Sequence, residues 1–428
     1  MTSKESSQVT RRKVEAGLPK RRRRERRFQI GGILATTVGV VFLGVFFADL
    51  IAKGSSAFRQ TYMQLDVEFT ADVIAPGGEL DLVYADFDGL VRAALRQQFP
   101  EVTGRSERRE LYKLVSIGAG YQMQDMIESD IEFLGTRQTI SVPASATVDM
   151  FVKGNIDATL DEALRPLSDA QIGWIESLQS AEKLALHLNS ALFSNGDSRE
   201  PELAGIKGAL MGSFYMLIVT LVLAFPVGVA AAIYLEEFAP RSRWSDLIEV
   251  NINNLAAVPS IVFGLLGLAV FINWMAIPRS APLVGGLVLS LLTLPVVIIA
   301  SRAAIKAVPP SIREAACGLG ASPMQVVFHH VIPLALPGML TGAIIGMSRA
   351  LGESAPLLMI GMVAFIVDVP GGFSDPATAL PVQIYLWADS PERAFAERTS
   401  AAIIVLLGFL LVMNLTAVIL RKRMERKW

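Results

Sequence analysis

Residues 29–51 read QIGGILATTVGVVFLGVFFADLI, an apolar stretch that follows directly on a strongly basic one. At 1.5 Å per residue, a helix of this length measures roughly 34 Å, which exceeds the ~30 Å hydrocarbon core of a bilayer. The stretch is also longer than the apolar part of a secretory signal, which has about 7 to 15 residues. We therefore expect a membrane-spanning helix here rather than a cleaved signal peptide.

Five further apolar runs predict a polytopic membrane protein. They lie at approximately 209–235, 255–277, 282–300, 336–366 and 401–420. Over the whole chain 18% of residues are charged, against about 25% in ordinary soluble domains. We expect an all-α architecture of six transmembrane helices, several of them interrupted by Pro or Gly. In the third run the small residues at Pro259, Ser260 and Gly264 predict close helix packing.

Basic residues predict which ends of the spans face the cytoplasm. Residues 1–28 carry eleven Lys and Arg against three Glu, and the tail at 422–428 is also basic. Because Lys and Arg stay on the cytoplasmic side during insertion, we expect both termini to be cytoplasmic. The basic head has no interleaved aromatic residues, so the sequence favours a membrane anchor and no nucleic-acid partner.

Residues 55–205 are expected to form a domain outside the membrane, on the side opposite the termini. They hold twelve Lys and Arg against 24 Asp and Glu. This acidity does not conflict with the orientation, because long domains are exempt from the charge rule.

The same segment shows the periods of both strands and helices, so we predict an α+β insert. Apolar residues alternate over 63–69 as in a half-buried strand, and 140–152 gives a weaker strand signal. Ser168 is followed by Gln171 at the spacing of a capping box, which predicts a helix running on towards Leu186.

No group of residues predicts a metal site, a cofactor site or a catalytic centre. The three histidines, His187, His329 and His330, have no carboxylate or cysteine at ligand spacing. Ser354 lies in GESAP, which lacks the G-x-S-x-G pattern of a nucleophile. The sequence also lacks a Walker A phosphate loop. We therefore expect a protein that is not an enzyme and that holds no metal or cofactor of its own.

Residues 309–340, between the fourth and fifth runs, read PPSIREAACGLGASPMQVVFHHVIPLALPGML and are too polar to span the membrane. From the pattern alone this is a compact connecting loop. Three of its parts match in spacing the EAA loop of ATP-binding-cassette importer permeases, which the segment resembles: Glu314-Ala315-Ala316, Leu319-Gly320-Ala321 and Ile332-Pro333. In that family the loop, here about 309–333, seats a coupling helix on the ATPase. The resemblance thus implies ATPase contact for Glu314, Ala315 and Gly320.

Four more segments resemble the A-type permease subunits of phosphate-specific transporters. They are 227–243, 256–271, 348–361 and 380–395, so that the resemblance covers about 206–421. It implies the type I importer permease fold in a bacterial inner membrane, with inorganic phosphate as the solute. The acidic insert departs from the shorter members of that family.

The resemblance also implies a machine of several chains. A second homologous permease subunit would share the membrane path, and two copies of a cytosolic ATPase would bind ATP and Mg. An external phosphate-binding protein would deliver the anion. Import of another oxyanion or small solute is an alternative that the loop does not exclude. A membrane receptor that senses a ligand through the outer domain is a further alternative.

Arg349 and Glu353 are the best candidates for the solute path, because ionisable residues are costly inside a membrane. One interpretation is an ion pair between residues four apart on one helix. The other is that Gly352 and Pro356 break the helix, so that the Arg349 guanidinium faces the anion while Glu353 orients it. Arg302 is a weaker candidate for the path, and snorkelling of its side chain to the membrane surface is the alternative.

Overall fold

The computed structural model describes residues 3–74, 82, 85–240 and 242–424. The chain divides into two compact units, Met1–Lys53 and Gly54–Trp428. The described residues of the first unit belong to one helix, α1 (Ser3–Ser55), which contains the predicted apolar run 29–51 without a break. Side chains from 21 to 49 are exposed, as expected of a helix that lies in lipid over its apolar part.

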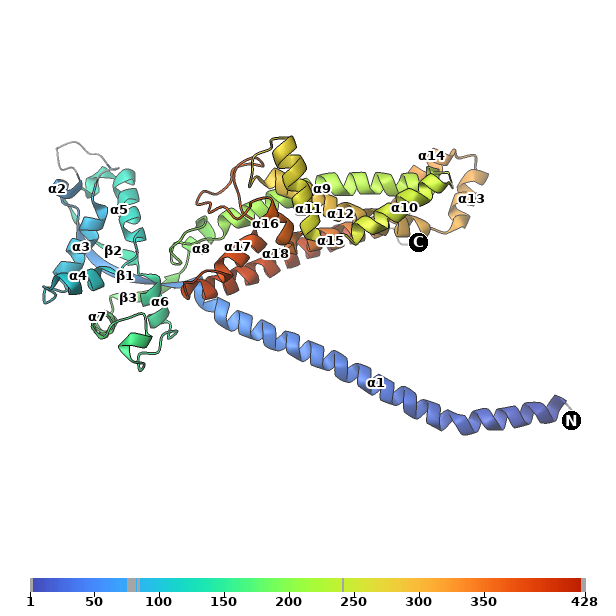
Figure 1. Ribbon diagram of the computed structural model, residues 1–428, viewed down its shortest axis with the longest axis horizontal. Coiled ribbons are helices and arrows are strands. Elements are labelled where there is room, and N and C mark those ends of the chain that lie inside the picture. The colour runs from blue at the N-terminus through green and yellow to red at the C-terminus, as the bar shows by residue number, and fades with distance from the viewer. Residues whose placement is uncertain (1–2, 75–81, 83–84, 241, 425–428) are drawn as a thin grey trace. The chain divides into compact units, whose positions relative to one another are not determined.

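Residues 55–205 contain a three-stranded antiparallel sheet with the strand order β2-β1-β3 (Figure 1). The central strand β1 (Arg59–Glu68) pairs with β2 (Arg137–Pro143) and β3 (Leu184–Leu188). The predicted alternation is confirmed, since Met63, Leu65 and Val67 are all completely buried. These side chains form the centre of a hydrophobic core that helices cover.

The helices of this segment are short. They are α2 (Ala71–Ile74), α3 (Phe87–Gln98), α4 (Arg105–Tyr112), α5 (Gly118–Ser129), α6 (Ala146–Val152), α7 (Asp169–Ser180) and α8 (Ala191–Ser194). Short 3-10 helices lie at Ser56–Phe58, Ile131–Phe133 and Glu162–Leu164.

Two boundaries predicted within the insert were wrong. The predicted strand 140–152 ends at Pro143, and Ala146–Val152 forms α6 instead. The capping box of Ser168 and Gln171 is confirmed, but the helix it starts ends at Ser180. Leu186 belongs instead to β3, whose pairing with β1 depends on residues more than 120 positions away.

The second half of the chain is helical and contains the other candidate spans. Its main helices are α9 (Lys207–Ile233), α10 (Arg243–Ala256), α11 (Ser260–Gly267), α12 (Pro282–Lys306), α15 (Ile332–Gly352) and α18 (Ala394–Met424). Shorter helices are α13 (Pro310–Gly318), α14 (Pro323–Gln325), α16 (Ala355–Met359) and α17 (Leu380–Ala388). Three π-helical segments occupy Tyr234–Phe238, Leu268–Trp274 and Val326–Val331.

Five helices of the described residues are long and apolar enough to cross a membrane, and there are six if the bent pair α10 and α11 makes one span. That pair corrects the predicted third run 255–277, because the chain bends by 100° near its beginning. Pro259 explains the bend, since proline disfavours helical backbone at the residue before it. The predicted fifth run 336–366 was also too long, because α15 ends at Gly352.

Helix α12 lies between α9 and α15 and packs against both (Figure 1). The contact with α15 is close because three glycines four residues apart face α12. A Cβ atom at Gly338, Gly342 or Gly346 would lie within 2.7 Å of a side-chain carbon of Ala304, Ala300 or Thr293. Small residues thus let these two backbones approach each other, as in other membrane helix pairs.

We predict that Gly342→Ala destabilises the protein by about 1–3 kcal/mol, since the new Cβ would lie 2.2 Å from the Ala300 Cβ. Thermal unfolding of the purified protein in detergent measures the effect. Gly408→Ala in α18 is the matched control, because no atom lies within 4 Å of its Cβ position. Equal stability of the two variants would contradict the packing described here.

Candidate functional site

Arg349 and Glu353 lie where α15 ends. The helix stops at Gly352, and Glu353 has extended backbone with φ −83° and ψ 118°. The Arg349 Nε lies 3.5 Å from the Glu353 Oε1, so the predicted pair and the predicted helix break occur together. Arg349 keeps 47% of its side chain exposed. A guanidinium that is held by one carboxylate and is otherwise open retains donors for an anion.

A second interrupted helix packs against this break. After the bend at Pro259, α11 runs beside α16, and a Cβ at Gly264 would lie 2.7 Å from the Pro356 Cα (Figure 1). The predicted packing role of Gly264 is therefore confirmed. Irregular backbone at membrane depth needs shielding by protein or by a water-filled path, and each of these breaks lies close to the other.

Arg302 occupies a different environment. Its guanidinium forms an ion pair with Glu236 at the end of α9, and its Nη2 lies 2.8 Å from the Glu249 Oε2 of α10. Lys306, one turn along α12, lies 3.3 Å from the same Glu236 carboxylate. Arg302 is thus largely buried between two carboxylates, an arrangement that differs from the snorkelling alternative.

The structure does not bring Arg302 and Arg349 together. Gly338 meets Ala304 and Gly342 meets Ala300, so Arg302 lies level with the part of α15 midway between the two glycines. Arg349 lies about nine residues further along, which is roughly 13 Å at 1.5 Å per residue. The two arginines therefore belong to separate sites.

The segment predicted to dock a partner forms α13 and the turn after it. Glu314 and Ala315 lie in the middle of this helix and are exposed, whereas Ala316 is buried in a core cluster with α15. Gly320 has φ +87°, and the Gly320 and Ala321 amides donate to the Cys317 and Ala316 carbonyl oxygens. This pattern is a Schellman motif, which ends a helix and favours glycine at the left-handed position.

Arg313 holds this helix in place, a role that the sequence did not predict. Arg313 Nη2 lies 2.8 Å from the Glu237 Oε1, and the same guanidinium donates to the carbonyl oxygens of Val308 and Ile305. The adjacent carboxylates Glu236 and Glu237 thus hold α12 and α13, respectively, to the end of α9. Two consecutive glutamates at the end of an apolar run were the available signal, but the sequence did not identify their partners.

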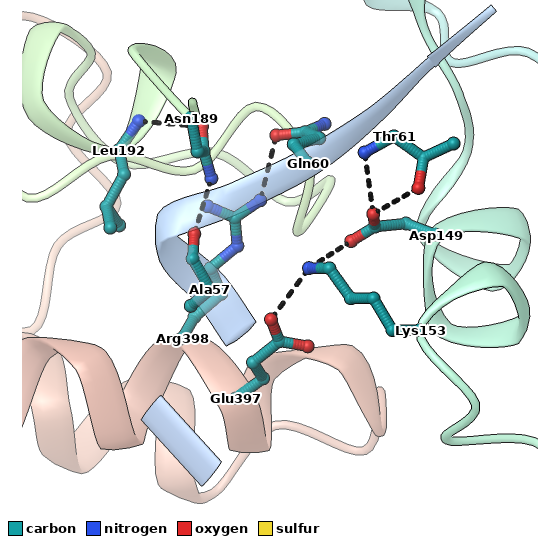
Figure 2. Close-up of polar contacts among 9 residues, drawn as sticks. All are labelled: Ala57, Gln60, Thr61, Asp149, Lys153, Asn189, Leu192, Glu397 and Arg398. Atoms are coloured by element: carbon teal, nitrogen blue, oxygen red, sulfur yellow. Dashed lines mark hydrogen bonds and ion pairs between the residues drawn. The ribbon is translucent and has the colours of Figure 1, made fainter. Parts of the chain in front are cut away.

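A second polar cluster joins the outer segment to α18 (Figure 2). The Lys153 Nζ lies 2.7 Å from both the Asp149 Oδ2 and the Glu397 Oε1, and only 6% of its side chain is exposed. The Asp149 Oδ1 also accepts hydrogen bonds from the backbone N–H and hydroxyl of Thr61. Next to Glu397, Arg398 Nη2 donates to the Gln60 Oε1. These contacts hold α6 and β1 to the beginning of the last span.

Two carboxyl groups near this junction are easier to protonate than exposed ones. Burial raises the pKa of the Asp197 carboxyl, although the Trp387 indole N–H donates to it at 3.0 Å. Burial likewise raises the pKa of the Glu202 carboxyl, whose Oε2 has no hydrogen-bond partner among the described residues.

Comparisons with known families match two separate parts of the chain. Residues 208–427 match the family described as binding-protein-dependent transport system inner membrane component, and this is about half of the chain. Residues 15–162 match a domain of unknown function, DUF3333.

Three relatives show how far the similarity extends. The probable ABC transporter permease protein YqgI of Bacillus subtilis is 37% identical over 36% of this chain and 52% of its own length, so the chain spans only about half of that relative. The phosphate transport system permease protein PstA 1 of Mycobacterium tuberculosis is 33% identical over 51% of this chain and 70% of its own length. PstA of Haemophilus influenzae is 30% identical over 53% of this chain and 79% of its own length.

Among solved structures, the chain resembles an inward-facing conformation of the MetNI methionine ABC transporter. The TM-score is 0.42 at 19% sequence identity, and the match covers 50% of this chain and 95% of that one.

We predict that Lys153→Met destabilises the protein by about 3–5 kcal/mol, because it leaves two buried carboxylates without their ion-pair partner. Thermal unfolding in detergent measures the loss of stability, and protease cleavage of the outer segment serves as the readout of unfolding. Lys113→Met is the control, since 60% of the Lys113 side chain and 35% of its partner Glu110 are exposed, and ion pairs at the surface contribute about 0–1 kcal/mol. Adding Glu397→Gln to Lys153→Met is expected to restore part of the stability. A loss no larger than in the control would contradict the buried junction.

We also predict that Gly320→Ala weakens the end of α13, since a left-handed conformation costs about 1–2 kcal/mol for a residue with a Cβ. Hydrogen exchange of the Gly318–Ala321 amides is expected to become faster. Gly318→Ala is the control, because its Cβ position is equally open and its φ is not positive. Unchanged exchange in Gly320→Ala would show that the turn tolerates a side chain.

Proposed function

Because this chain belongs to the family of binding-protein-dependent transport system inner membrane components, we propose that it is the permease subunit of an ATP-driven importer of inorganic phosphate. The observation that carries the substrate is its similarity to phosphate transport permeases, at 30–33% identity over 70–79% of their lengths. The chain is a transport subunit and not an enzyme. Hydrolysis of ATP belongs to a separate ATPase subunit, which would bind the nucleotide and Mg.

The proposed path for the anion passes the break between α15 and α16. Arg349 would contact phosphate oxygens through its planar set of donors, and Glu353 would hold the guanidinium in place. The half-exposed Arg349 side chain supports this assignment. A contribution of Arg302 to the path is a weaker proposal, because two carboxylates already occupy its guanidinium.

The proposed ATPase contact is the exposed side of α13, with Glu314, Ala315 and the turn at Gly320. Leu319 lies at the tip of this turn with 90% of its surface exposed, as expected of a side chain that a partner covers. Movement of α13 would reach the spans through Arg313 and Glu237, since these residues connect it to α9. Alternating access would then follow from ATP-driven movement of this helix.

The assembly we propose contains a second homologous permease subunit, two ATPase copies and an external phosphate-binding protein. Both termini would face the cytoplasm in a bacterial inner membrane, with the insert 55–205 outside. The insert carries twice as many acidic as basic residues. A negative surface lowers the local concentration of free phosphate, which favours delivery by a binding protein over capture from solution.

Phosphate uptake into vesicles that contain the full complex tests these roles. Arg349→Ala is expected to lower uptake roughly tenfold or more, since the loss of a hydrogen bond to a charged group costs about 1.5–3 kcal/mol. ATPase binding should be retained in this variant, whereas Glu314→Ala should lose it. Arg105→Ala, an exposed arginine of the insert, is the control and should transport normally.

Two results would separate the parts of this proposal. Uptake of another oxyanion but not of phosphate by the wild-type complex would overturn the substrate and leave the permease assignment intact. Normal phosphate uptake by Arg349→Ala would instead place the anion path elsewhere.

A further inference from the structure

The hydrophobic core covers most of one face of the outer sheet. On the same face, β3 carries a row of apolar residues that extends past the edge of this core. Leu184, Leu186 and Leu188 lie on the same face of β3, opposite Met63, Thr61 and Arg59 of β1, respectively. Met63 is completely buried, but 44% of Leu186 and 74% of Leu188 are exposed. The exposure of the leucines therefore increases towards the first residue of β1.

That end of the sheet is fixed beside the place where the chain leaves α1. Arg59 follows the last residue of α1, Ser55, by four positions. Asn189, the neighbour of Leu188, donates its backbone N–H to the Phe58 oxygen at 2.9 Å and its side-chain N–H to the Ala57 oxygen at 3.0 Å (Figure 2). Leu188 is thus held at the base of the insert.

The same base packs against the outer part of the last span. Ala57 and Leu192 are completely buried in one cluster with Ala401 and Ala402 of α18. The apolar run of α18 begins at Ala401. The base of the insert therefore packs against α18 where that apolar run begins.

A further apolar side chain is exposed at this level. Phe193 of α8 stacks on Phe58 with ring centroids 5.9 Å apart, and it remains almost half exposed. We call Leu186, Leu188 and Phe193 the base patch. Arg59, which is also exposed, pairs with Leu188 across the two strands.

We propose that the base patch lies in the interfacial layer of the lipid bilayer, with Arg59 close to lipid phosphate groups. Apolar side chains in this layer gain by burial at the boundary between headgroups and acyl chains, and a basic side chain beside them binds anionic headgroups. Lipid is the occupant that we propose, because the base of the insert packs against α18 at Ala401 and Ala402, where the apolar run of that helix begins. The insert thereby has a second anchor besides the Lys153 junction, and the two together limit its tilt.

A fluorescent label tests this in the full-length chain, reconstituted in vesicles of phosphatidylethanolamine and phosphatidylglycerol. With Cys317→Ser as background, Leu188→Cys carries an environment-sensitive dye. The control is Ile131→Cys, which is 61% exposed and lies near the opposite end of β1, where Phe133 contacts Phe69. Ten strand residues separate the two positions by roughly 30 Å.

The dye at 188 is expected to show blue-shifted emission and about threefold stronger quenching by spin-labelled lipids than the dye at 131, because only the former would reach the interfacial layer. Phe193→Cys serves as a second position and should follow 188. Equal quenching at 188 and 131 would overturn the proposal. A blue shift at 188 that needs the second permease subunit would also overturn it, since the patch would then be a protein interface.

Discussion

Backbone polar groups inside a bilayer have no water to bond, and this constraint determines most of the second half of the chain. A helix pairs its backbone N–H and C=O groups with each other. The uninterrupted spans α9, α12 and α18 therefore need little more than length and apolar side chains. A break exposes backbone groups that need other cover. The bend before α11 and the break after α15 meet at Gly264 and Pro356. Each interrupted helix therefore shields the other, and Arg349 lies at the edge of this shielded region.

The close contact of α12 and α15 determines where the functional side chains lie. Gly338, Gly342 and Gly346 have no side chains of their own, so α15 approaches Ala304, Ala300 and Thr293 of α12 closely and in one register. That register keeps Arg302, which pairs with Glu236 and Glu249 on other elements, well separated from Arg349. Arg302 therefore connects helices through ion pairs, whereas the Arg349 side chain remains half exposed.

Ion pairs connect neighbouring elements at both ends of the spans. On one side, Glu236 and Glu237 connect the end of the α9 span to α12 and to α13. On the other, Lys153 connects the insert to α18 between two carboxylates. Buried pairs of this kind add little net stability, but the loss of one partner is costly. They therefore fix the relative positions of elements that apolar packing alone would allow to slide.

The sequence by itself determined the features that depend on neighbouring residues. Length and hydropathy located the apolar runs, Ser168 and Gln171 marked a helix start, and Gly352 with Pro356 indicated the break beside Arg349.

Only the tertiary structure decided which distant residues meet. Lys153 and Glu397 are 244 positions apart, and Arg313 and Glu237 are 76 apart. No local pattern marks such a pair, because an ion pair needs only opposite charges that packing has already brought together. The strand at Leu186 was missed for the same reason, since its backbone hydrogen bonds go to β1 and not to its own neighbours.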